Sequence, residues 1–277
     1  MIHQNRTTSN GDDKVKEPMH ILLTNDDGIH AEGLTALYHT FKKNHHVTVI
    51  APDREQSAVG HGITLNHPIR VTEIQSPCGD TSYAVSGTPV DCIKLAFLEL
   101  LPSKPDLVVS GINRGANLGV NINYSGTAAA AREATLYRVP AIAASIQGQQ
   151  GGDFIHAAEY IQELAMETVS RELPVGTFLN VNFPGVGFHE IKGVRVCRQG
   201  LSFPDEYLDK RKDPRNRTYY WHGCEFTITE TDPAIDSAAV EDGYITVTPV
   251  KCDLTDNEMI AHLSAWETIQ RDKSLKN

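Results

Sequence analysis

The sequence predicts an α/β fold, with a Rossmann-like, mostly parallel sheet core followed by a β-rich C-terminal extension (an arm or hairpin) and a closing helix. Short apolar runs alternate with helical patterns from residue 19 to about residue 183, which is the strand–helix–strand order of parallel sheets. After about Phe188 the strand-like runs stand between long polar segments. We therefore expect a disordered polar extension over residues 1–18, an α/β core over 19–187 and a C-terminal extension over 188–277.

The composition excludes several classes of protein. The 277 residues carry a formal net charge of −10 and are 40 % hydrophobic, which argues against intrinsic disorder and against nucleic-acid binding over the whole surface. No apolar stretch approaches the roughly 20 residues of a membrane span, so we expect no membrane association. The 5 cysteines form no CxxC pair, and no apolar region precedes Pro18. Free thiols in the cytoplasm are the simplest expectation.

The first half of the core shows clear periodicity. His20–Thr24 is a short apolar run that ends in turn residues, which predicts a buried strand. Apolar residues at spacings of three and four over 34–41 predict a helix, and the β-branched run 47–51, stopped by Pro52, predicts a second strand. Further on, 83–85 and 106–111 are expected to be strands and 89–101 a helix that has Pro89 in its first turn.

The second half continues the alternation and then changes. The expected strands are 140–145, 178–181, 194–196, 226–228 and 244–248, and the expected helices are the Ala-rich 127–137, the amphipathic 154–170 and the final 258–270. Residues 205–217 are dense in charge and contain proline, which predicts an exposed loop or arm.

Polar residues gather at the expected carboxyl ends of three strands, where open parallel sheets bind their ligands. Asp26 and Asp27 follow the first strand, Ser57 follows the second, and Asn113 follows the central one. Adjacent carboxylates repel each other, and oxygen ligands suit a hard divalent cation such as Mg²⁺ or Mn²⁺. A helix N-cap with a solvated turn carboxylate explains the two aspartates equally well on their own.

A glycine- and asparagine-rich stretch over 110–119 leads to Ser125, Gly126 and Thr127 at the start of the Ala-rich helix. Unpaired N–H groups at a helix start bind anions, so this segment is a candidate phosphate site that includes Asn117. A plain capped helix explains the capping, but loops of this length are usually functional. The nucleotide-binding patterns GxxxxGK[ST] and GxGxxG are absent from the expected positions.

Three other polar residues have two interpretations each. His30 could act as a general acid, but a surface position is the commoner case for a histidine. Arg54 and Arg114 could steer an anionic substrate, or they could be exposed loop charges.

Several of these motifs together resemble the SurE family. The resemblance begins with the segment Thr24–Leu34, which includes the Asp pair, and extends from about Met19 to near Asp256. The other matching segments are 51–54 with Ser57, 87–92, 109–113, 124–130, 213–215, 218–221 and 242–249. The polar residues before Pro18 and the segment Ala58–His61 depart from the family pattern.

The resemblance implies a metal-dependent phosphatase that acts on nucleoside 5′- and 3′-monophosphates, and also on short polyphosphate. It implies one divalent cation, Mg²⁺ or Mn²⁺, held by Asp26, Asp27, Ser57 and Asn113. It also implies a Rossmann-like core and a C-terminal extension that exchanges between subunits. A homodimer or homotetramer follows from that exchange.

We expect catalysis to rest on Asp26 and Asp27, with phosphate bound by Asn117, Ser125, Gly126 and Thr127. Asp27 could accept the proton of an attacking water, or an aspartate could attack directly; the sequence does not choose between these. A phosphatase of the haloacid-dehalogenase type would need DxD, whereas Asp26 and Asp27 are adjacent. A nucleotide sensor without activity would gain little from two carboxylates beside a phosphate.

Overall fold

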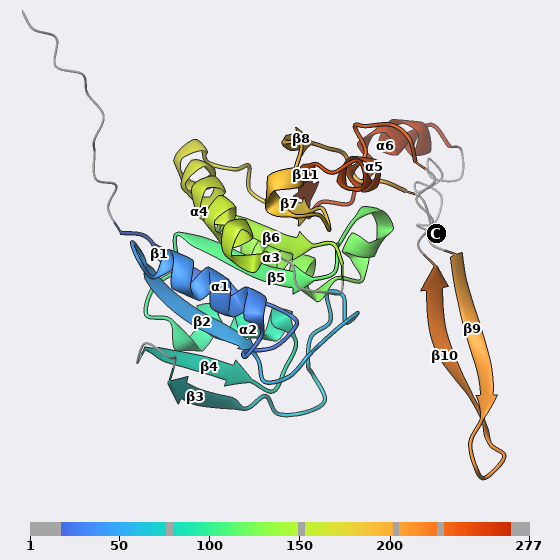
Figure 1. Ribbon diagram of the computed structural model, residues 1–277, viewed down its shortest axis with the longest axis horizontal. Coiled ribbons are helices and arrows are strands. Elements are labelled where there is room, and N and C mark those ends of the chain that lie inside the picture. The colour runs from blue at the N-terminus through green and yellow to red at the C-terminus, as the bar shows by residue number, and fades with distance from the viewer. Residues whose placement is uncertain (1–17, 76–79, 149–152, 202–204, 226–229, 267–277) are drawn as a thin grey trace, which may run out of the picture.

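The fold is a three-layer α/β/α sandwich built on one large sheet (Figure 1). The computed structural model describes residues 18–75, 80–148, 153–201, 205–225 and 230–266. Within them, nine strands form a sheet in the order β3-β4-β2-β1-β5-β6-β7-β11-β8. The strands are β1 His20–Thr24, β2 His46–Pro52, β3 Val71–Gln75, β4 Thr81–Val85, β5 Leu107–Arg114, β6 Ala141–Ile146, β7 Thr177–Phe183, β8 Val194–Val196 and β11 Ile245–Lys251.

The six central strands, from β4 to β7 in the sheet order, all run parallel to one another. Taken in chain order they follow the doubly wound arrangement 3-2-1-4-5-6, because β2 and β4 lie on one side of β1 and β5, β6 and β7 lie on the other. The chain therefore reverses its direction of winding between β1 and β5. This reversal opens a crevice at the carboxyl ends of these two strands, which is where such sheets bind ligands.

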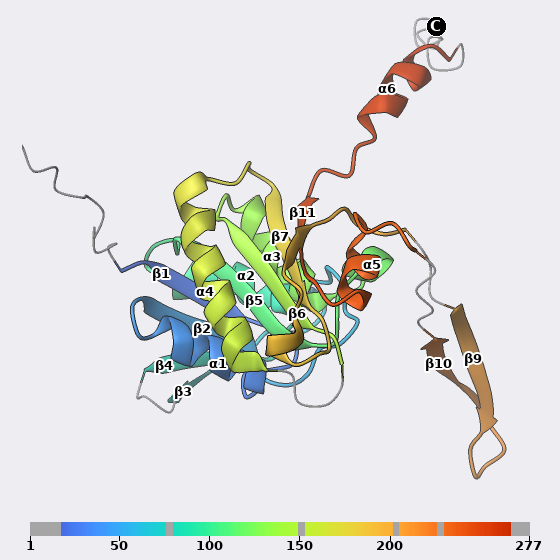
Figure 2. The same cartoon turned by 45° about the horizontal axis from the view of Figure 1, so that its top comes forward.

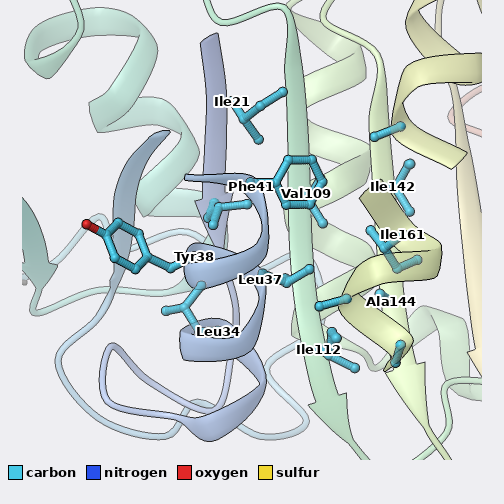
Figure 3. Packing of buried hydrophobic residues seen from close by; sticks show 14 of the residues in the cluster. Ile21, Leu34, Leu37, Tyr38, Phe41, Val109, Ile112, Ile142, Ala144 and Ile161 are labelled. Carbon is cyan, nitrogen blue, oxygen red and sulfur yellow. The ribbon is translucent and has the colours of Figure 1, made fainter. Parts of the chain in front are cut away.

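Helices cover both faces of the sheet. α1 (Glu32–Phe41) and α4 (Phe154–Arg171) pack on one face, whereas α2 (Pro89–Leu95) and α3 (Gly126–Leu136) pack on the other. Figure 3 shows Leu37 and Phe41 of α1 directed at Val109 of β5, with Ile161 of α4 beside Ile142 of β6. Two fully buried apolar clusters thus fix the strand ends that carry the polar residues.

The segment after Gly187 divides between the main sheet and a separate hairpin. β8 and β11 extend the sheet, with β11 antiparallel to β7, so the expected division at residue 188 does not coincide with a break in the sheet. β9 (Asp205–Lys212) and β10 (Thr218–Glu225) pair with each other and extend away from the core (Figure 1). The short helix α5 (Asp236–Glu241) packs beside β11.

Most expected elements are present, with some differences. The expected arm over 205–217 is present, and it consists of strand β9 and the hairpin turn. The strand itself was not expected, because its sequence is too polar to predict one without the pairing to β10. β3, β10 and α5 were not expected, and α2 continues as a π-helix over Ala96–Leu100. The expected strand 226–228 and residues 1–17 lie outside the described residues.

The final helix α6 (Asn257–Ser264) ends before the expected residue 270, and residues from 267 on lie outside the described part. It does not pack on the core, since all of its residues except Leu263 are exposed. Figure 2 shows the helix held away from the sheet. In the part of the chain that the structure describes, no helix is both long enough and apolar enough to cross a bilayer.

Candidate active site

A tight turn after β1 presents the two aspartates at the carboxyl edge of the sheet. The Asn25 side chain closes this turn, because its Nδ2 donates to the Gly28 carbonyl at 2.9 Å and its Oδ1 accepts from the Gly28 amide at 3.2 Å. Gly28 has a φ of +101°, a backbone conformation that favours glycine. Asp26 and Asp27 therefore occupy a fixed turn rather than a mobile loop.

Asp26 forms the buried end of the site. Its side chain is only 5 % exposed, and its Oδ1 accepts a hydrogen bond from the Thr127 hydroxyl at the start of α3. Burial raises the pKa of Asp26 to about 6, and the neighbouring charge of Asp27 acts in the same direction. Ionised Asp26 is thus held at an energetic cost, which a bound cation would offset.

Asp27 lies beside Asp26 but nearer the solvent. It is half-buried, and its Oδ2 accepts a hydrogen bond from the Arg114 amide at 3.2 Å, which links the end of β1 to the end of β5. Burial raises the pKa of Asp27 as well, with a further contribution from the charge of Glu55.

Ser57 approaches the same edge from the loop after β2. The Gln56 amide donates to the Asp26 carbonyl at 2.7 Å, and the Ser57 hydroxyl donates to Glu55 Oε1 at 2.5 Å. The Ser57 hydroxyl oxygen keeps its lone pairs in this arrangement, so it retains the capacity to bind a cation.

The Ser57 loop is anchored on the other side by a buried carboxylate. Glu133 of α3 is 4 % exposed, and it accepts from His61 Nε2 at 2.7 Å and pairs with Lys94 Nζ at 2.6 Å. Asp91 of α2 accepts in addition from the amide of Thr64 at 3.1 Å. The segment after Ser57, where the sequence departs from the family pattern, is therefore fixed to α2 and α3.

Asn113 lies near the end of β5, half-buried, and lines the same cavity as Asp26. Its Nδ2 donates to the Gly115 carbonyl at 2.7 Å. This bond uses the amide nitrogen, so the side-chain oxygen is left to bind a cation. Two carboxylates, a hydroxyl and an amide oxygen make an all-oxygen donor set, and this set fits a hard divalent cation. No cluster of three His, Cys, Asp or Glu suited to a metal occurs among the described residues, so any site here depends on the two neutral ligands.

The expected phosphate-binding residues come together at the start of α3 and in the loop before it. Ser125 is the N-cap of α3, where its hydroxyl accepts from the Ala128 amide at 3.0 Å. Asn117 is held by the Ser145 hydroxyl at 2.8 Å and by the side chain of Asn182, whose Oδ1 accepts from the Asn117 amide at 2.7 Å. The hydroxyl of Thr127 is already engaged with Asp26, so Thr127 acts on the aspartate.

A cavity of about 540 Å³ opens at this edge. Its size lies in the usual range for small-molecule sites. It is lined by Asp26, Ser57, Ala58, Asn113, Arg114, Ala116, Asn117, Asn121, Tyr124, Ser125, Glu206 and His222. Five of these were expected from the sequence as ligands of the metal or the phosphate. Glu206 and His222, which come from the hairpin, were not expected, because no local sequence pattern shows which part of the core a hairpin lies beside.

A third unexpected residue, Asp236, holds the loop that carries Asn117. Its fully buried carboxylate accepts from the amides of Gly119 and Gly200, both at 2.9 Å, and from that of Ser237 at 2.9 Å. Gln199 Nε2 donates to the Gly119 carbonyl at 2.9 Å. Burial raises the pKa of Asp236, although the three amide donors oppose that change. The C-terminal segment thus fixes one end of the loop that carries Asn117.

The three remaining candidates have different positions. His30 is exposed and lines a separate cavity of about 300 Å³ beside Tyr38 and Ser82. Arg54 is exposed and lies 3.9 Å from Asp53. Arg114 lines the candidate site and pairs with Glu32 at 2.6 Å, so it is the one of the three that a substrate in this cavity could meet.

The chain is similar to known proteins of one family. The family model described as "Survival protein SurE" matches residues 21–205. The chain is 52 % identical to the 5′-nucleotidase SurE of Desulfatibacillum aliphaticivorans, with 90 % of this chain and 98 % of the relative covered. It is 46 % identical to the 5′-nucleotidase SurE of Syntrophobacter fumaroxidans, over 90 % and 99 % of the two chains. The crystal structure of the SurE protein from Aquifex aeolicus superposes with a TM-score of 0.76 at 37 % identity, covering 88 % of this chain and 99 % of that one.

Proposed function

This chain belongs to the SurE family, and we propose that it is a metal-dependent 5′-nucleotidase that hydrolyses nucleoside monophosphates to nucleoside and phosphate. The proposal extends to 3′-monophosphates and to short-chain polyphosphate as further substrates. The observation that carries it is the meeting of Asp26, Asn113 and the start of α3 in one cavity. Such a site combines oxygen ligands for a cation with hydrogen-bond donors for a phosphate.

Asp26, Asp27, Ser57 and Asn113 would hold one divalent cation, Mg²⁺ or Mn²⁺. When bound, the cation neutralises charge on the phosphate and lowers the pKa of a coordinated water. The protein supplies the geometry: the Thr127 hydroxyl fixes Asp26, and the Arg114 amide fixes Asp27. Phosphoryl transfer depends mainly on such positioning and on electrostatic stabilisation.

The phosphate oxygens would be held by Asn117, by Ser125 and by the first backbone N–H groups of α3 at Gly126 and Thr127. The positive end of the helix dipole favours an anion there. The Asn117 side chain is already oriented by Ser145, so it would lose little conformational freedom on binding. These groups would stabilise the charge that develops on the non-bridging oxygens.

Asp27 is the better candidate for accepting the proton of the attacking water. Asp26 is almost fully buried and is engaged by Thr127, whereas Asp27 is half-buried and accepts only a weak amide bond of 3.2 Å at Oδ2. Direct attack by an aspartate is the alternative, and trapping of an aspartyl-phosphate would establish it.

The deciding experiment measures phosphate release from nucleoside 5′- and 3′-monophosphates, p-nitrophenyl phosphate and polyphosphate, with Mg²⁺, Mn²⁺ or EDTA. We expect release that EDTA abolishes, and a loss of several orders of magnitude in Asp26→Asn and Asp27→Asn. The matched control is Asp242→Asn, an exposed carboxylate paired with Lys192 at 2.9 Å. Folded protein that binds AMP with Mn²⁺ but releases no phosphate would instead be a nucleotide sensor.

The proposal also includes a homodimer or homotetramer formed through the C-terminal extension, in the cytoplasm. The free thiols of Cys92, Cys197 and Cys252 suit a reducing compartment. Exposed apolar side chains on the hairpin, among them Leu208, Tyr220 and Trp221, support burial of this region against another subunit.

A further inference from the structure

The hairpin residues Glu206 and His222 line the same cavity as Asp26 and Asn113. We propose that the β9–β10 hairpin forms the nucleoside end of the active site, where Glu206 and His222 bind the nucleoside and Glu206 lowers the activity on polyphosphate relative to that on nucleoside monophosphates. This inference rests on the proposed nucleotidase function and adds to it the residues that select the substrate.

The register of the hairpin places both side chains on one face. Glu206 pairs with Cys224, and Leu208 pairs with His222. Since side chains two apart on a strand share a face, and directly opposed residues share it too, Glu206 and His222 are diagonal neighbours. The two side chains can therefore contact one ligand together.

The cavity has a buried end and an exposed end. Asp26 is 5 % exposed and Ser125 is 6 % exposed, whereas Tyr124 is 55 % exposed. Glu206 and His222 are also exposed. A phosphate bound at the buried aspartates would direct its leaving group towards the exposed end, and a volume of about 540 Å³ leaves room there for a nucleoside.

The chemistry of the exposed end suits a nucleoside. The carboxylate of Glu206 can accept hydrogen bonds from ribose hydroxyls or base N–H groups, and the imidazole of His222 can donate, accept or stack on a base. Tyr124, which lines the same cavity, adds an aromatic ring. A second or third phosphate in the same place would meet the carboxylate of Glu206, and like charges repel.

The test compares three substrates in the full-length protein with the same metal: a nucleoside 5′-monophosphate, p-nitrophenyl phosphate and tripolyphosphate. We expect Glu206→Ala and His222→Ala to lower kcat/KM for the nucleotide by about tenfold, mainly through KM, and to change p-nitrophenyl phosphate by less than about twofold. Glu206→Gln should raise the ratio of tripolyphosphate to nucleotide activity by about tenfold. The matched control is Asp209→Asn, a carboxylate on the opposite face of β9 that pairs with Arg211 at 2.6 Å.

Two results would overturn the inference. Equal losses on all three substrates would mean that the hairpin acts through folding or assembly, and unchanged kinetics would mean that it does not contact the substrate. If the wild-type protein released no phosphate from any ester, the proposed function would fail instead. In that case calorimetry of AMP and of inorganic phosphate with Mn²⁺ still tests the hairpin, because the two substitutions should weaken AMP binding and leave phosphate binding unchanged.

Discussion

A Cβ atom on Gly126 would lie only 2.8 Å from the Cβ atom of Asp26. The first residue of α3 thus lies directly against the buried aspartate, and only a residue without a side chain fits between them. This contact brings the start of a helix and the end of β1 into one site, although the two residues are far apart in the sequence.

We expect Gly126→Ala to lower kcat/KM by at least about tenfold, because the added methyl must displace Asp26 or α3, and small displacements of catalytic groups are costly. The affinity for Mn²⁺, measured by calorimetry, should fall with it. A thermal unfolding midpoint within a few degrees of the wild type would show that the loss is local. Unchanged kinetics would contradict the role given to Asp26.

Glu133→Gln tests the anchor of the Ser57 loop through its pH dependence. Burial raises the pKa of Glu133, but the hydrogen bonds from His61 and Lys94 outweigh it and leave this pKa below its ordinary value of 4.5. The folded state therefore binds the proton more weakly than the unfolded state. The resulting stability is fully present above about pH 4.5 and is lost as the pH falls through the lower folded pKa.

Glu133→Gln should cost roughly 1–3 kcal/mol of unfolding free energy at neutral pH, and the difference from wild type should shrink below about pH 4.5. Urea unfolding of the metal-free proteins at several pH values measures this. The control is Glu167→Gln, since Glu167 forms an exposed i,i+4 pair with Arg171 at 3.3 Å, and such pairs contribute little. A pH-independent difference would assign the effect to packing.

Asp236→Asn should disturb the loop that carries Asn117. An amide presents only one acceptor oxygen, so either the Gly119 or the Gly200 amide loses its partner. We expect about 1–3 kcal/mol less stability and a raised KM for nucleotide with a smaller change in kcat. Steady-state kinetics and urea unfolding measure the two effects. Asp232→Asn, which removes an exposed partner of Arg198 at 2.8 Å, serves as the control.

Removal of residues 254–277 should reduce the size of the assembly. Leu254, Met259, Ile260 and Trp266 are between 40 % and 79 % exposed, which is unusual for so many large apolar residues on one short segment. Light scattering coupled to size exclusion should show a smaller particle for the truncated chain. A full-length chain that is already a monomer would refute the proposed assembly.

The parallel core could be predicted from sequence because its signals are local. The apolar run of β1 and the helical spacing of Leu34, Leu37 and Phe41 reflect burial on a sheet that the rest of the chain completes. β3 and β9 gave no such signal, because they are exposed and polar. These two strands form through pairing with β4 and β10, and such pairing cannot be predicted from the local sequence.

The site divides in the same way. Asp26, Asp27 and Asn113 follow strands, so the rule that parallel strands present their carboxyl ends at one edge was enough to bring them together. Asp236 and His222 reach the site through a later part of the chain, and their positions depend on how that part returns to the core. Asp236 is buried and accepts hydrogen bonds from the loop amides. Its burial could not be predicted, because the surrounding sequence is polar.

The antiparallel strand β11 also affects how the protein is made. The parallel strands through Phe183 leave the ribosome first, and β7 has no neighbour on its outer side until residues 245–251 follow. For that interval the nascent chain carries an open strand edge, which invites pairing with other chains. A message cut short before Ile245 would yield a fragment that contains every residue expected to bind the metal, yet leaves that edge uncovered. Such a fragment should collect in aggregates, so the pairing of residues 245–251 with β7 protects the protein from this fate.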